Sequence, residues 1–204
     1  LMGQPFAYKH VDLRAGAHKQ PEYLAINRFG QVPALVDGDL KLCQSGSILL
    51  YLADKIGRFI PADLRGRNEA LQWLFWQMGG LGPMAGQNHH FTQYAPEPVP
   101  YAINRYVKET ARLYAVLNKH LAGRDFIAGD YSIADMACYP WIVPYERQSQ
   151  KLEDFPEIKR WFESIWDRPA TKKAYALVKQ VNPAPVVDEA ARKLLFGQDA
   201  KTVR

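Results

Sequence analysis

The stretch QVPALVDGDLKLCQSGSILLYLADKIG, residues 31–57, contains the signals that decide the fold. Two short apolar runs, residues 34–36 and 41–43, lie on either side of a polar turn that contains Asp37 and Gly38. Asp-Gly between two such runs is a strong signal for a β-hairpin, because both residues tolerate the left-handed backbone of a tight turn. We therefore predict two short antiparallel strands here.

A helix is predicted directly after this hairpin, beginning at Ser45. Its apolar side chains recur at a helical period, and Gly57 fits the left-handed position that commonly ends a helix. The residues that define the period are Ile48, Leu52 and Ile56.

Upstream of the hairpin, residues 6–11 suit a strand and residues 21–26 suit a short helical turn. A strand followed by a crossover predicts parallel pairing between residues 6–11 and 34–36. Residues 1–58 therefore predict a small α/β domain. Residues 1–4 are typical of the end of a helix, so one strand and one helix of this domain are expected before residue 1.

Downstream of a predicted linker at residues 59–66, the apolar pattern is helical almost throughout. The periodicity predicts a helix from about residue 67, others at residues 100–121, 133–143 and 158–165, and a last one at residues 187–195. The helix at residues 133–143 is apolar nearly all round, which indicates a central buried position. Residues 67–204 therefore predict an all-helical bundle.

The composition excludes several classes of function. The net charge is +5, but the Lys and Arg residues are scattered rather than gathered into a patch, so no nucleic-acid partner is predicted. No apolar run approaches the ~18 residues needed to cross a bilayer, so no membrane role is predicted. The two cysteines, Cys43 and Cys138, have no CxxC or metal-type spacing, which favours a reducing, cytoplasmic location.

The first candidate binding motif is the turn into the first hairpin strand. Pro33 follows Gly30-Gln31-Val32, a context that favours a cis peptide bond. A cis turn would leave the Val32 N–H and C=O free to pair with an extended peptide. The alternative is an ordinary proline at the start of a strand.

The second motif, Gln44-Ser45-Gly46, joins the second strand to the helix. The unpaired N–H groups and the dipole at a helix N-terminus favour an anion, and the Ser45 hydroxyl adds a donor. The alternative is simple capping by Ser45. The two motifs lie at adjacent strand ends, so together they predict a site for a peptide backbone and a carboxylate.

At these residues the chain resembles the glutathione transferases. The stretch HKQPEYLAINRFGQVPALVDGD, residues 18–39, is similar to the plant phi-class pattern. Residues 71–91, LQWLFWQMGGLGPMAGQNHHF, and residues 100–106, PYAINRY, resemble the bacterial nu class, which includes disulfide-bond reductases. The resemblance implies a thioredoxin-like N-terminal domain, a homodimer, and glutathione as co-substrate with no permanently bound cofactor.

Carried over to this sequence, the resemblance also implies which residues bind glutathione. They are Val32 beside a cis Pro33 for the cysteinyl part, Gln44 and Ser45 for the γ-glutamyl end, His18, Lys19 and Gln31 for the glycyl end, and Arg105 on the helical domain. Gln44 departs from the usual Glu, and its neutral carbonyl accepts with less charge assistance. The resemblance places the Ser, Thr, Tyr or Cys that activates the thiol in a loop expected before Leu1, so the catalytic residue is unassigned.

Other motifs are expected to be structural. Ser132 and Asp135 have the spacing of a capping box at the start of the buried helix. No third ligand stands at a suitable spacing from His89 and His90, so no metal is predicted, and we expect a lining or packing role. The alternatives of acceptor-pocket lining and core or dimer packing stay open for Trp73, Phe75, Trp76, Tyr101 and Tyr106.

Three hypotheses follow. The first is a glutathione transferase that conjugates glutathione to small hydrophobic electrophiles, with glutathione-dependent disulfide reduction as a further activity. The second is a transferase-like binding or interaction protein without catalysis. The third is an inactive, poorly soluble truncated product, since a missing strand would expose a sheet edge.

Overall fold

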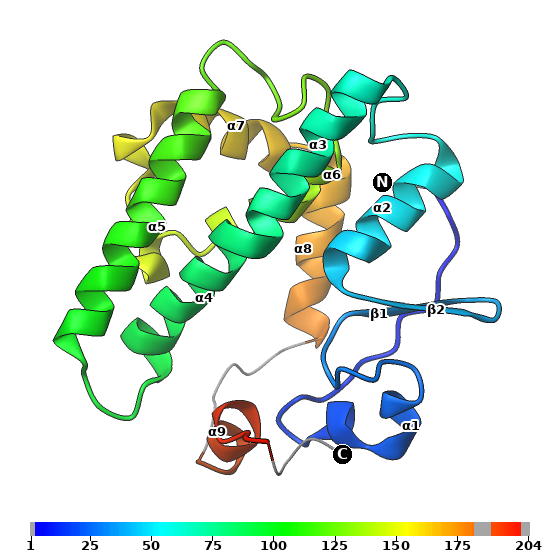
Figure 1. Cartoon of the computed structure of the whole chain (residues 1–204), viewed down its shortest axis with the longest axis vertical. Helices are drawn as coiled ribbons and strands as arrows, with labels where there is room; N and C mark the ends of the chain where they lie inside the picture. The colour runs from blue at the N-terminus through cyan, green and yellow to red at the C-terminus, as the bar shows by residue number, and fades with distance from the viewer. Residues whose placement is uncertain (1–2, 182–188, 201–204) are drawn as a thin grey trace. The chain divides into compact units, whose positions relative to one another are not determined.

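A computed structural model describes residues 3–181 and 189–200 of the 204-residue chain (Figure 1). By its internal contacts the chain divides into two compact units, Leu1–Ile48 with Lys172–Arg204, and Leu49–Thr171. The predicted domains, residues 1–58 and 67–204 with a linker at 59–66, divide the chain by sequence, whereas these units are defined by contacts. The predicted domain bounds therefore stay a prediction.

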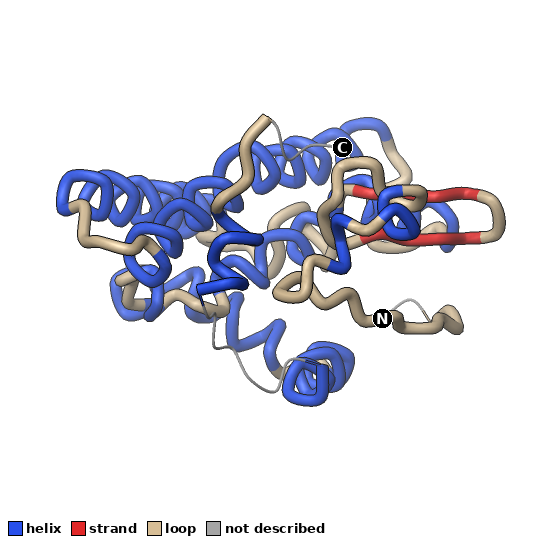
Figure 2. Tube along the Cα trace, turned by 90° about the horizontal axis from the view of Figure 1, so that it is seen from below, coloured by secondary structure: helices blue, strands red, loops and turns tan. Residues whose placement is uncertain are grey.

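The first unit contains the predicted hairpin, drawn in red in Figure 2. Strand β1, Ala34–Asp37, pairs antiparallel with strand β2, Leu40–Cys43. The turn between them uses Gly38 at a φ of 63°, a left-handed conformation that favours glycine. Since Ala34 pairs with Cys43, the residues that flank this pair, Pro33 and Gln44, lie at the same end of the hairpin.

Short helices surround the hairpin in the chain. A 3₁₀ turn, Ala17–Lys19, precedes α1, Pro21–Leu24, and both come before β1. Helix α2, Ser45–Ile56, begins directly after β2 and ends before Gly57, whose φ is 64°. The hairpin, the helical turn at residues 21–26 and the helix from Ser45 are therefore confirmed.

The strand predicted at residues 6–11 is wrong. Residues 3–11 are irregular, with Phe6 79% and Tyr8 63% exposed, and among the described residues β1 pairs only with β2. A strand needs a neighbour to complete its hydrogen bonds, which an apolar pattern does not supply. The expected parallel pairing with residues 34–36 is therefore absent. Gly3 and Gln4 are loop, and residues 1–2 lie outside the described part.

The second unit, together with the C-terminal segment, is helical, as predicted. Its helices α3 and α6 pack together, α4 and α7 pack on α5, and α6 also contacts α7. Within the residues that the structure describes, no helix combines the length and apolarity needed to cross a membrane. The bounds are α3 Leu64–Trp76, α4 Gly82–His89, α5 Pro100–His120, α6 Ile133–Ile142, α7 Pro156–Trp166, α8 Pro169–Val181 and α9 Glu189–Phe196.

The structure adds features that the pattern does not predict. Helix α3 begins three residues before the predicted start, because the Asp63 side chain accepts a hydrogen bond from the Gly66 N–H at 2.8 Å. Two π-helical turns, Gln77–Leu81 and His90–Tyr94, flank α4, and α8 is not predicted. The last helix is described from Glu189, so the predicted start at Val187 lies outside the described residues.

Helix α6 forms the centre of the second unit. Ile133, Cys138 and Ile142 are fully buried, in agreement with the all-round apolar pattern. Ser132 and Asp135 form a capping box at its start. The Asp135 carboxylate also accepts hydrogen bonds from the Trp161 indole N–H at 2.8 Å and the Ile127 N–H at 3.0 Å.

Candidate functional site

The two predicted binding motifs meet at one end of the hairpin. The Val32–Pro33 peptide is cis, as the sequence predicts, and Val32 is 44% exposed. Within the described residues, the Val32 N–H and C=O have no hydrogen-bond partner. Val32 therefore presents an accessible donor and acceptor beside the start of α2.

Gln44 makes the turn from β2 into α2. Its φ is 70°, a left-handed conformation that costs a non-glycine residue ~1–2 kcal/mol. The Gln44 carbonyl accepts the first bond of the helix, from the Ile48 N–H at 3.0 Å, and its side chain is exposed. Such strain is commonly held at functional sites. Here it places an exposed amide beside Ser45, the half-buried first residue of α2.

Three residues predicted for the glycyl end gather around Gly30. At this position, where φ is 56°, a Cβ would lie 3.1 Å from the Lys19 Nζ and 3.2 Å from the His18 carbonyl oxygen. Gln31 follows directly and is exposed. The His18 side chain is only 4% exposed, so any ligand contact is limited to that small surface.

The buried imidazole of His18 predicts a pH effect on stability. Burial, and next the charge of Lys19, lower the pKa of His18 below its ordinary value, and its Nδ1 has no partner among the described residues. A lowered folded-state pKa contributes stability that is present above the unfolded pKa of about 6.5 and lost as the pH falls. We expect urea unfolding midpoints to fall more steeply from pH 7 to pH 5 in the wild type than in His18→Gln.

The control for this measurement is His10→Gln, which removes an exposed histidine of the same unit. Its pH profile is expected to match the wild type. Parallel profiles for His18→Gln and wild type would show that His18 is not the titrating group.

Arg105 lies on α5, in the other unit. Its side chain is 55% exposed and forms an ion pair with Glu109 at 3.5 Å. Glu109 is held more closely by Arg112, through two hydrogen bonds of 2.7 and 3.0 Å. Arg112, and then Arg105, lower the pKa of Glu109. Because Arg112 already satisfies this carboxylate, Arg105 is a cation that can turn to another anion at small cost.

His89 and His90 and the predicted aromatic residues lie in different environments. Burial, and next Arg147, lower the pKa of His89, and the described residues contain no cluster of three His, Cys, Asp or Glu that could hold a metal. Trp73 packs against Trp76 and His120, and Tyr106 stacks on Phe91. Phe75 and Tyr101 are 65% and 80% exposed.

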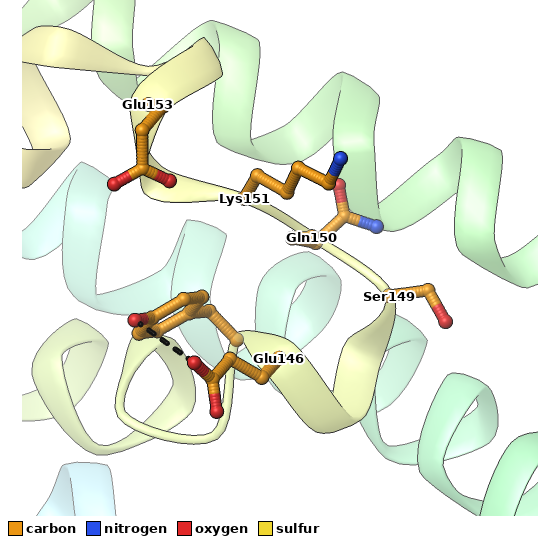
Figure 3. A pocket seen from close by; sticks show the side chains of 6 residues that line it. Glu146, Ser149, Gln150, Lys151 and Glu153 are labelled. Atoms are coloured by element: carbon orange, nitrogen blue, oxygen red, sulfur yellow. Dashed lines mark hydrogen bonds between the residues drawn. The ribbon is translucent and has the colours of Figure 1, made fainter.

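An open pocket of about 530 Å³ lies on the second unit (Figure 3). The Tyr145 hydroxyl donates a hydrogen bond of 3.5 Å to the carboxylate of Glu146, which Figure 3 labels. None of the predicted binding residues lines it, so it is not part of the candidate site. The lining residues are Tyr145, Glu146, Ser149, Gln150, Lys151 and Glu153.

Sequence reasoning missed two residues that contact the site's backbone. The Tyr23 hydroxyl and the Asn27 side-chain N–H both donate to the Gln31 carbonyl, at 2.7 and 2.6 Å. The available signal was the polar Asn27 at the end of the mostly apolar run YLAIN, residues 23–27, just before the Gly30 turn.

Comparison with known proteins agrees with this fold. Residues 1–54 match the family model of the glutathione S-transferase N-terminal domain, and residues 100–169 match that of the C-terminal domain. The chain therefore belongs to the glutathione S-transferase family. The two-stranded sheet with its helices is the thioredoxin-like N-terminal domain of this family, and the helices within residues 100–169 belong to its C-terminal domain.

Among its relatives is the disulfide-bond oxidoreductase YfcG of Escherichia coli (strain K12), 51% identical over 172 residues, which are 80% of each chain. A solved glutathione transferase from Burkholderia graminis, with two glutathione molecules bound per subunit, is 38% identical at a TM-score of 0.78 and covers 84% of this chain and 77% of its own. One from Pseudomonas putida, with one glutathione disulfide per subunit, is 35% identical at a TM-score of 0.79 and covers 84% and 80%.

Proposed function

We propose that this protein is a glutathione-dependent enzyme that reduces disulfides and transfers glutathione to small hydrophobic electrophiles. The observation that carries the proposal is the hairpin register, in which the segments that contain Val32 and Ser45 both extend from the end with the Ala34–Cys43 pair. One offers a free main-chain donor and acceptor, and the other begins a helix. Glutathione carries a peptide backbone and a γ-glutamyl carboxylate, the two kinds of group that such a donor–acceptor pair and a helix N-terminus bind.

In this proposal each binding residue meets one part of the tripeptide. The Val32 N–H and C=O pair with the cysteinyl main chain, as a strand edge pairs with an extended peptide. The γ-glutamyl carboxylate lies at the start of α2, where Ser45 and the helix N–H groups donate to it. The exposed Gln44 carbonyl oxygen accepts from the α-amino group.

The remaining residues meet the other charges of the ligand. Lys19 and Gln31, with the small exposed surface of His18, receive the glycyl carboxylate, and Arg105 supplies a further cation. These residues bind the tripeptide, and none of them is assigned the activation of its thiol. The proposal includes a homodimer that works in the cytoplasm, in keeping with the small number of cysteines.

Disulfide reduction proceeds by thiol–disulfide exchange. The glutathione thiolate attacks one sulfur of the substrate disulfide, forming a mixed disulfide and releasing the other sulfur as a thiolate. A second glutathione thiolate then attacks the glutathione sulfur of the mixed disulfide. The products are glutathione disulfide and a second substrate thiolate, so two electrons pass from two glutathione molecules to the substrate. The 51% identity to a disulfide-bond oxidoreductase supports this reaction.

The test removes two of the residues proposed to bind the charged groups of glutathione. The double variant Ser45→Ala/Arg105→Ala is expected to elute from immobilised glutathione without retention and to bind at least tenfold more weakly by calorimetry, because each lost charge-assisted contact is worth ~1.5–3 kcal/mol. The matched control is Ser47→Ala/Lys108→Ala, which alters exposed residues of the same two helices and should be retained like the wild type.

Two outcomes would contradict parts of the proposal. Retention of the Ser45→Ala/Arg105→Ala variant on immobilised glutathione would show that these two residues are not its ligands. Binding without turnover, measured with a small disulfide and with an aromatic halide electrophile, would favour the non-catalytic binding protein.

A further inference from the structure

The carbonyl of Gln31 is held by two side chains that come from one short segment. The Tyr23 hydroxyl, on α1, donates to it at 2.7 Å, and the Asn27 side-chain N–H donates to it at 2.6 Å. Asn27 is 1% exposed. Gln31 itself is exposed. Its carbonyl therefore accepts from two side-chain donors although water could reach it.

The Asn27 donor is fixed in place by its other hydrogen bonds. The Asn27 Oδ1 accepts the Phe29 N–H at 3.0 Å, and the Asn27 main-chain N–H donates to the Tyr23 carbonyl at 2.8 Å. These bonds determine which side of the Asn27 amide faces Gln31. Burial raises the pKa of the Tyr23 phenol, so it remains a protonated donor at neutral pH.

The consequence falls on the next N–H. The Gln31 carbonyl and the Val32 N–H belong to one planar peptide unit, and in a trans peptide they point in opposite directions. A carbonyl that is held from one side by two donors therefore fixes the direction of the Val32 N–H. Two hydrogen bonds at the carbonyl also polarise the amide and strengthen its N–H as a donor.

We propose that Tyr23 and Asn27 are positioning residues, which hold the Gln31–Val32 peptide so that the Val32 N–H is directed at the main chain of the ligand. This inference rests on the proposed function, because that function identifies the ligand as glutathione. This role needs only the Tyr23 hydroxyl, and the ring does not have to contact the ligand.

The test is Tyr23→Phe, which removes one hydroxyl and keeps the ring. One neutral hydrogen bond corresponds to about a three- to tenfold change in equilibrium constant. We expect glutathione to bind about three- to tenfold more weakly, and KM for glutathione to rise by a similar factor with kcat unchanged, because the contact is equally present in the ground and transition states. The matched control is Tyr8→Phe, in the same unit and 63% exposed, which should leave both values unchanged.

A spectroscopic readout separates positioning from a general loss of stability. The ¹H and ¹⁵N shifts of the Val32 amide are expected to change in ligand-free Tyr23→Phe and to respond less to added glutathione, whereas the Tyr8→Phe protein should match the wild type. Unchanged affinity in Tyr23→Phe, or weaker binding with an unchanged Val32 amide, would overturn the inference. If wild-type protein does not bind glutathione, or binds it without moving the Val32 amide, the proposed function or its Val32 assignment fails instead.

Discussion

Replacing Asp135 by alanine is expected to lower the free energy of unfolding by about 3–5 kcal/mol, because several buried donors lose their acceptor together. The Asp135 carboxylate is fully buried at the start of α6 and accepts from the Ser132 N–H at 2.9 Å, the Ile127 N–H at 3.0 Å and the Trp161 indole at 2.8 Å. Burial raises the pKa of Asp135, although these donors oppose the change. Alanine would leave each donor unsatisfied.

This loss should appear in the melting temperature and in the urea midpoint of the whole chain. For a protein of this size, ~1 kcal/mol corresponds to roughly 2–4 °C, so we expect a fall of about 10 °C. The matched control is Asp125→Ala, whose side chain is 89% exposed and pairs with Arg160 at 3.4 Å. That exposed pair should contribute under about 1 kcal/mol. An unchanged melting curve for Asp135→Ala would contradict the central role of this carboxylate.

Replacing Ser45 by aspartate is expected to weaken glutathione binding about 100-fold while leaving stability unchanged or slightly higher. Aspartate is favoured in the first turn of a helix, where its charge interacts well with the dipole. The same negative charge would occupy the position that we assign to the γ-glutamyl carboxylate. Like charges brought together in a binding site cost several kcal/mol, and ~2.7 kcal/mol corresponds to 100-fold.

This substitution separates the two interpretations of Ser45. If the residue only begins the helix, Ser45→Asp should bind glutathione like the wild type. Ser47→Asp is the control, because it adds the same charge to the same first turn at an exposed position, and calorimetry should give it a nearly unchanged dissociation constant. Wild-type affinity in Ser45→Asp would show that the γ-glutamyl carboxylate does not bind at this end of α2.

The features predicted correctly from the sequence are those encoded by neighbouring residues. The Asp37-Gly38 turn, the helix from Ser45 to Gly57 and the Ser132–Asp135 cap each depend on residues a few positions apart. The strand at residues 6–11 failed because a strand depends on a distant partner, which its own pattern does not specify.

The same limit applies to the candidate site. The Val32 and Ser45 motifs were visible because each is a local signal, and the register of the hairpin then brings them together. The contacts of Tyr23 and Asn27 with Gln31 depend on how the loop at Gly30 closes, and the bond from Trp161 to Asp135 joins two separate helices. Neither follows from periodicity.

The hairpin register also makes the turn at Gly38 a useful place for engineering. Four residue pairs, from Ala34–Cys43 to Asp37–Leu40, separate this turn from the end that carries Val32 and Ser45. At ~3.4 Å per residue this is about 10 Å of paired backbone. A fluorophore attached at the exposed Asp39 would therefore label the protein far enough from that end to leave the proposed main-chain partners of the ligand untouched.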